Sequence, residues 1–94
     1  MTRRAEKLID DRYPLSPRSF VEMVVWRVPD PVPGSRHRFK YRLAFIVESV
    51  CVLRYDNEAG KGDHRHWKGC EAPYNFADLD TLQADFWRDV EAMT

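Results

Sequence analysis

The chain has 94 residues, of which 44% are hydrophobic, 13% aromatic and 32% charged. This length supports a single domain over 1–94 with one core and excludes a second folded domain. The longest apolar runs are only a few residues, far below the roughly 20 that a membrane-spanning helix needs, so a membrane protein is excluded. The first residues lack an apolar stretch and a small-residue cleavage site, which predicts a cytoplasmic chain without a secretory signal.

Basic and acidic residues number 15 each and cancel, but they are unevenly distributed. The stretch 34–68 has eight basic and four acidic residues and all three histidines, whereas 69–94 has one basic and six acidic residues. A basic middle before an acidic tail indicates one surface that attracts phosphates and another that repels them or meets a basic partner. The alternative is a solvated surface whose charges are merely uneven.

Three segments are predicted to be strands. Residues 20–28 are rich in β-branched and aromatic side chains and end at a proline-rich stretch, which indicates a strand followed by a stiff loop. Residues 39–48 alternate apolar and polar side chains with the period of a half-buried strand. Residues 50–56 follow after the Glu48-Ser49 corner, so we expect an antiparallel hairpin.

The last segment is predicted to be a helix, because Asp78 or Asp80 can cap its start and apolar residues then recur at helical spacing. Its apolar stripe comprises Leu79, Leu82, Phe86, Val90 and Met93, and its outer side Asp85, Arg88, Asp89 and Glu91. Elsewhere, 5–13 fits a strand or a helical turn, and 74–76 fits a brief strand. We therefore predict an α+β fold, a small antiparallel β-sheet of about four strands with a C-terminal α-helix packed on one face.

The segment 55–66, YDNEAGKGDHRH, builds no core, because it has two glycines and no aliphatic residue larger than alanine. Gly60 and Gly62 bracket Lys61, so the backbone can adopt positive φ and point its N–H groups at a phosphate beside the ammonium. The glycine spacing of a Walker loop is absent. An ordinary surface turn is the alternative interpretation.

The run Asp63-His64-Arg65-His66 has the most specific chemical pattern. If it is extended, its two histidines point to one side and Asp63 and Arg65 to the other. Two imidazoles beside cations can supply a general base, a general acid and stabilisation of a phosphorane, which are the parts of a metal-independent ribonuclease. The histidines could instead be structural, or they could bind a metal together with Asp56, Asp63 or Glu58. The surrounding positive charge disfavours a divalent cation, so we expect no metal and no other cofactor.

Cationic and aromatic side chains interleave before and within the second predicted strand. If the strand extends far enough, four basic residues share one face: Arg36, Arg38, Lys40 and Arg42. Like charges in a row repel one another, so this basic strip is better explained by an anionic ligand such as RNA than by solvation alone. An ordinary solvated sheet face is the alternative.

Three stretches together resemble the TumE family, small bacterial toxins of type II toxin-antitoxin systems: FVEMVVWRVPDPVPGSRHRFKYRLAFIV, YDNEAGKGDHRH and ADFWRDVEAM. The resemblance spans roughly residues 20–91, and GKGDHRH is its most specific motif. It implies a cytosolic bacterial toxin that is encoded with a helix-turn-helix antitoxin, which binds and neutralises it. It assigns no catalytic role to individual residues. One departure is the 48–49 corner, where a glycine-containing turn would be expected.

Two hypotheses of function follow. In the first, the protein is an endoribonuclease in which His64 and His66 share acid and base catalysis and Asp63 orients one of them. Lys61 and Arg65 would then stabilise the transition state. The RNA would be held by Arg36, Arg38, Lys40, Arg42, Gly60 and Gly62. In the second hypothesis, the protein is a non-catalytic module that uses the same basic strip on nucleic acid or on an acidic partner.

Overall fold

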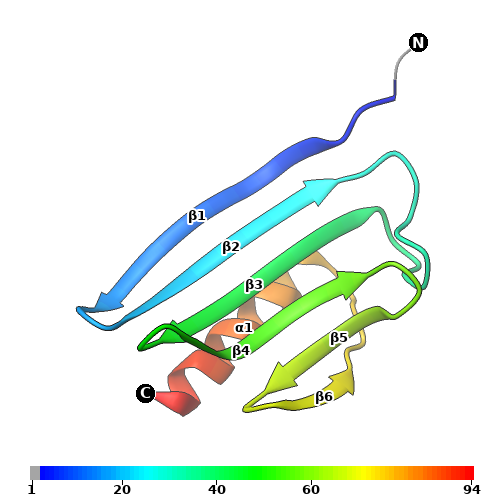
Figure 1. Cartoon of the computed structure of the whole chain (residues 1–94). Helices are drawn as coiled ribbons and strands as arrows, with labels where there is room; N and C mark the ends of the chain where they lie inside the picture. The colour runs from blue at the N-terminus through cyan, green and yellow to red at the C-terminus, as the bar shows by residue number, and fades with distance from the viewer. Residues whose placement is uncertain (1–2) are drawn as a thin grey trace.

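The computed structural model describes residues 3–94, which form one antiparallel six-stranded sheet followed by one helix (Figure 1). The elements are β1 (Glu6–Ser16), β2 (Ser19–Arg27), β3 (Phe39–Val47), β4 (Val50–Glu58), β5 (Gly62–Trp67), β6 (Cys70–Pro73) and α1 (Leu79–Met93). Each strand pairs with the one before it, so the order in the sheet follows the chain. The predicted α+β class, the hairpin at 48–49 and the C-terminal helix are confirmed.

The prediction of about four strands is wrong, because the sheet has six. Residues 6–16, within a region that fits a strand or a helical turn, form β1, and neither β5 nor β6 is among the predicted strands. Residues 6–16 pair with β2 along their whole length, although most of their side chains are exposed and show no amphipathic period. At the other edge, β6 pairs with β5 over Cys70–Pro73, not over the 74–76 segment. Edge strands of this kind are fixed by backbone pairing with a neighbour, so their own side chains carry little signal.

The glycine-free corner between β3 and β4 closes the hairpin with two residues of positive φ. Glu48 has φ 49 and Ser49 has φ 69, values that hairpin turns favour for their twist. The neighbouring turn supports this conformation, since the Glu48 N–H donates to the Arg18 carbonyl at 2.8 Å and the Arg18 guanidinium lies 3.0 Å from the Glu48 carboxylate.

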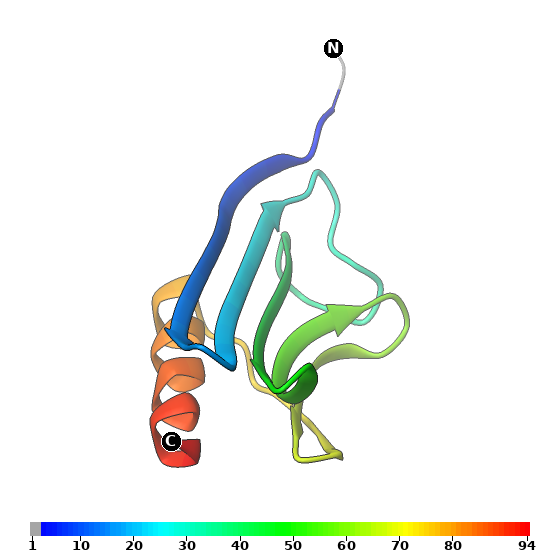
Figure 2. The same ribbon diagram turned by 60° about the vertical axis from the view of Figure 1, so that its left-hand side comes forward.

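The core lies between one face of the sheet and α1, as the turned view shows (Figure 2). Alternate residues of the central strands supply the sheet side of this core: Val21, Met23, Val25, Tyr41, Leu43, Phe45, Leu53 and Tyr55. The helix supplies Leu82, Phe86 and Val90, three residues of the predicted stripe. Asp78 caps the helix by accepting from the Thr81 N–H at 2.7 Å.

Two acidic residues of the helix face the sheet, which corrects their predicted place on the outer side. The Tyr74 hydroxyl donates to Asp85 at 2.7 Å, and Asp89 accepts from the Tyr55 hydroxyl. Burial and this bond raise the pKa of Tyr55 above its ordinary value. Asp85 and Asp89 border the apolar stripe, where tyrosines of β4 and of the segment after β6 reach them, so these two acids anchor the helix.

The opposite face of the sheet, called the open face below, carries the remaining alternate side chains. Within residues 3–94, no helix covers it (Figure 2). The one helix of this part of the chain is not long and apolar enough to cross a membrane.

Candidate active site

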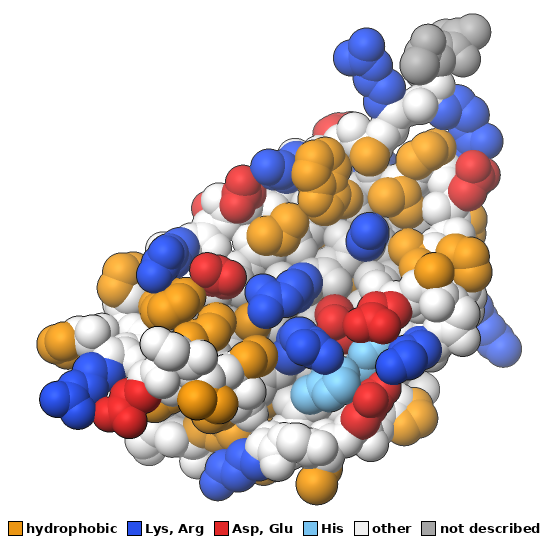
Figure 3. Space-filling view, in the orientation of Figure 1, with side chains coloured by type: hydrophobic (Ala, Val, Ile, Leu, Met, Phe, Trp, Pro, Cys, Tyr) orange, Lys and Arg blue, Asp and Glu red, His pale blue; other side chains and the backbone are white. Residues whose placement is uncertain are grey.

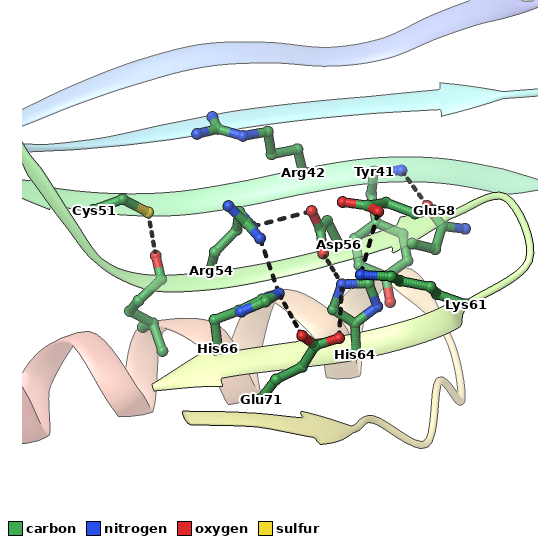
Figure 4. Close-up of polar contacts among 12 residues, drawn as sticks. Tyr41, Arg42, Cys51, Arg54, Asp56, Glu58, Lys61, His64, His66 and Glu71 are labelled. Atoms are coloured by element: carbon green, nitrogen blue, oxygen red, sulfur yellow. Dashed lines mark hydrogen bonds and ion pairs between the residues drawn. The ribbon is translucent and has the colours of Figure 1, made fainter. Parts of the chain in front are cut away.

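The strand register gathers charged side chains of β3 to β6 on the open face. Arg42 pairs with Asp56, and Asp56 pairs with His64, so these three residues form one cross-strand row. The next row runs from Arg54 through His66 to Glu71. We call these six residues the charged cluster (Figure 4). In Figure 3 the histidine side chains lie among basic and acidic ones on this face.

His64 lies at the floor of the cluster, with a side chain that is only 5% exposed. Its Nδ1 is 3.0 Å from the carbonyl oxygen of Gly62, and because a carbonyl can only accept, Nδ1 carries a proton. Its Nε2 is 2.8 Å from Oδ1 of Asp56. These two buried atoms are not aligned for a hydrogen bond, so the contact is electrostatic.

His66 is in contact with a guanidinium. Nη2 of Arg54 lies 2.8 Å from Nε2 of His66, and because a guanidinium can only donate, this nitrogen accepts. The Nε atom of the same arginine is 3.1 Å from Asp56. Arg54, a member of the second row, therefore also contacts the first row and links His66 to the acid that faces His64.

The cluster also contains the ligand types of a metal site. Asp56, His64 and His66 each offer an atom within 4.8 Å of the others. However, the Arg54 guanidinium already contacts two of these three residues and supplies a permanent positive charge beside them. Asp63, another ligand considered from the sequence, lies on the other face of β5. The donor set is therefore better matched to a guanidinium than to a divalent cation.

The basic residues predicted to bind RNA do not all share a face. Lys40 and Arg42 lie on the open face within β3, but the strand begins at Phe39, so Arg36 and Arg38 belong to the preceding loop. The strand begins at residue 39 as predicted, so the condition under which all four basic residues would share one face is not met. Lys61 borders a hollow of about 300 Å³ together with His64 and Glu71.

Asp63 and Arg65 point to the helix-covered face, as alternation along β5 requires. Asp63 accepts from the Ser35 hydroxyl at 2.5 Å, from His37 at 2.6 Å and from the Tyr41 hydroxyl at 2.7 Å. Arg65 donates to Asp89 of the helix at 2.7 Å. The structure therefore does not bring these two residues together with the histidine pair, and each holds another segment against the sheet.

The glycines of the 60–62 turn serve a close backbone approach. The Gly60 N–H donates to the Pro33 carbonyl at 2.7 Å, and the Lys61 N–H donates to Glu58, so neither is directed at a phosphate. Gly62 has φ +74, and a Cβ there would lie 2.7 Å from the oxygen of Gly34. The turn thus packs against the proline-rich loop, in place of the predicted phosphate cradle.

The comparison with known families comes from the sequence as a whole. A family model described as Toxin TumE matches residues 2–94, nearly the entire chain. The chain belongs to the TumE toxin family. This result confirms the resemblance carried by the strand and GKGDHRH segments. Neither the comparison with curated proteins nor that with solved structures gives a match.

Proposed function

We propose that this TumE family member is the toxin of a bacterial type II toxin-antitoxin system and acts in the cytoplasm as a metal-independent endoribonuclease. The proposal rests on two neighbouring histidines whose nearest partners have opposite charges. One lies against a carboxylate and the other against a guanidinium, and their ring centroids are 4.9 Å apart. Such a pair offers a proton donor and a proton acceptor on one surface.

His66 is the general base in this mechanism. Its Nε2 accepts from Arg54 and so has a lone pair, and its side chain is 23% exposed. When RNA binds, this nitrogen takes the proton of a ribose 2′-hydroxyl, and the 2′-oxygen attacks the adjacent phosphorus. The guanidinium is then free to turn to the phosphate, where negative charge develops.

His64 is the general acid. A lone pair of Nε2 would be repelled by a carboxylate at 2.8 Å, so we assign a proton to this nitrogen as well as to Nδ1. Nε2 of His64 is buried until Arg54 turns to the phosphate and uncovers it, and it then gives its proton to the 5′-oxygen as the bond between phosphorus and that oxygen breaks. The products are a 2′,3′-cyclic phosphate and a 5′-hydroxyl end. Asp56 positions His64, the role first considered for Asp63.

The remaining cations bind the RNA. Arg54 contacts His66 and Lys61 borders the hollow beside His64, so we assign these two residues to the charge of the phosphorane in place of Arg65. Arg42, which pairs with Asp56, binds an adjoining phosphate. Lys40 and the loop residues Arg36 and Arg38 extend the positive charge along the RNA backbone. A non-catalytic binding module would use the same cations without proton transfer, and this is the alternative that the experiment separates.

The neutralising partner follows from the toxin family. We propose that a helix-turn-helix antitoxin encoded beside this gene covers the open face with acidic side chains. Membership of a toxin family supports the need for such a partner, and the cations around Arg42 supply a complementary surface.

The test is an RNA cleavage assay with the purified full chain in EDTA, with mass analysis of the product ends. We expect cleavage with cyclic phosphate ends, and a rate loss of about 10²–10⁴-fold for His66→Ala with RNA binding retained. Arg54→Ala should also cleave RNA more slowly than the wild type. Its matched control is Arg88→Ala, on the exposed side of α1, which should cleave RNA at the wild-type rate. Binding without cleavage by the wild type would support the binding module instead.

A further inference from the structure

The open face carries a partly exposed tryptophan between two lysines. In the strand register, Trp26 of β2 pairs with Lys7 on one side and with Lys40 on the other. The ammonium of Lys7 lies 5.0 Å from the centre of the indole ring. Hydrophobic side chains gather above the histidines on this face, over the end of β2 (Figure 3). An aromatic ring flanked by cations thus lies on the same surface as the charged cluster.

A small hollow lies beside this ring. It has a volume of about 220 Å³, and Trp26 and Val24 line it together with Lys40 and Arg42. The two apolar residues offer an apolar contact, and the two cations line the same hollow. No other part of the mechanism above uses these apolar residues.

We propose that Trp26 is a stacking platform for one base of a single-stranded RNA, with the neighbouring phosphates bound by Lys40 and Arg42. Every base has a π face, and aromatic rings that alternate with cations are the usual means of binding single strands without sequence preference. A base within a duplex is already stacked on both sides and cannot reach the indole. The inference rests on the proposed function and names its substrate class.

The sheet geometry connects the platform to the histidines. Trp26 lies on β2 and the histidines on β5, three strand spacings away, so they are separated by at least about 14 Å. Lys40 and Arg42 on β3 lie between them and mark the path of the backbone. The stacked base therefore belongs to a nucleotide a few positions along the strand from the cleaved one, and the platform holds the strand in register with the site.

Binding can be measured without cleavage by using a labelled 2′-O-methyl uridine decamer, whose blocked 2′-oxygen prevents the reaction. By fluorescence anisotropy, we expect Trp26→Leu to weaken binding by about 5- to 150-fold and Trp26→Phe to weaken it far less. Leucine keeps an apolar side chain at this position, so the variant should fold, and thermal melting verifies this. Trp67→Leu is the matched control, because Trp67 lies on the helix-covered face, and it should bind as the wild type does.

A second readout follows the indole itself. The decamer should quench tryptophan fluorescence of the wild type and of Trp67→Phe, and the quenching should be lost in Trp26→Phe. The same decamer annealed to its complement should bind more weakly and should not respond to Trp26→Leu.

The outcomes separate this inference from the proposed function. Loss of decamer binding in Trp26→Leu would support the platform even if the wild type cut no RNA. Decamer binding within twofold of the wild type in Trp26→Leu, or no binding by the wild type, would overturn the platform even if RNA were cut.

Discussion

Asp56 and His64 lie opposite each other on β4 and β5, with Oδ1 2.8 Å from Nε2 and side chains only 10% and 5% exposed. A carboxylate this buried needs a compensating positive charge, and Arg54 provides one, with its Nε 3.1 Å from Oδ2 of Asp56. In the proposed mechanism the same carboxylate positions the general acid, so the pair links the stability of the sheet to the proposed reaction.

Asp56→Asn should impair both functions of this pair. The amide keeps the shape but leaves the His64 proton without its carboxylate, so we expect cleavage to fall by about 10²-fold or more. The free energy of unfolding should fall by up to about 3–5 kcal/mol, the usual cost of breaking a buried ion pair. Glu58→Gln, an exposed acid at the end of the same strand, is the control for urea melts and rate assays. An Asp56→Asn protein with wild-type cleavage would exclude the proposed role of Asp56.

The contact of Gly62 with Gly34 gives a stability prediction. Gly62→Ala places a Cβ 2.7 Å from a backbone oxygen at φ +74, so we expect a loss of about 2–4 kcal/mol from strain and overlap. Gly60→Ala is the matched control, because its φ is +84 but no atom lies within 4 Å of the new Cβ. Gly60→Ala should lower the free energy of unfolding by only about 1–2 kcal/mol, the cost of holding alanine at a positive φ. Equal losses for the two variants in urea melts would contradict the steric argument.

The core strands and the helix could be predicted because burial leaves a periodic pattern. Phe39 to Val47 alternates without interruption, and the helix repeats its apolar residues at helical spacing. β1 and β6 could not be predicted in the same way, since most of β1 and all of β6 are exposed. Their existence depends on backbone pairing with a neighbouring strand, which leaves no trace in side-chain pattern.

Part of the candidate site could also be predicted from the alternation of buried and exposed residues along the strands. Arg54 and Asp56 alternate with the core residues Leu53 and Tyr55, which places both on the open face. Alternation along β5 likewise separates Asp63 from the histidines, so the acid nearest in sequence is not the acid nearest in space. Glu71 needed the pairing of β5 with β6, which only the structure provides.

Tyr41 makes stability depend on alkaline pH. Burial, and then the hydrogen bond to Asp63, raise the pKa of Tyr41 above its ordinary value of 10.0. Its contribution is fully present below pH 10.0 and is lost as the pH rises above this value, because the unfolded tyrosine ionises first. The wild type should therefore lose stability more steeply than Tyr41→Phe, by up to about 1.4 kcal/mol per pH unit. Urea melts between about pH 9 and pH 11 measure how steeply the free energy of unfolding falls for the wild type and for Tyr41→Phe. Tyr13→Phe, at an exposed site, should differ much less from the wild type in this slope.

The contacts of the Arg54 guanidinium lead to a testable prediction about metal binding. If it takes the place of a cation, the wild type should cleave RNA in EDTA and gain no thermal stability from Zn²⁺. Arg54→Ala frees the atoms of Asp56, His64 and His66, so this variant should be stabilised by Zn²⁺ in a concentration-dependent way. The double variant Arg54→Ala/His66→Ala should lose that response. Cleavage that disappears in EDTA and returns with a divalent ion would favour a metal site at the same residues.

The antitoxin contact provides the last prediction. An inhibitor that silences the site must cover the open face, and acidic side chains complement the cations of β3 and speed the encounter. Arg42→Glu and Lys40→Glu should therefore weaken binding of the antitoxin and also reduce toxicity in a growth assay. Arg88 lies on α1, on the other side of the sheet, and its neighbours are acidic. Arg88→Glu should therefore change neither antitoxin binding nor toxicity. If the open-face reversals abolished toxicity but left antitoxin affinity intact, the antitoxin would have to act from another surface, and direct occlusion would be wrong.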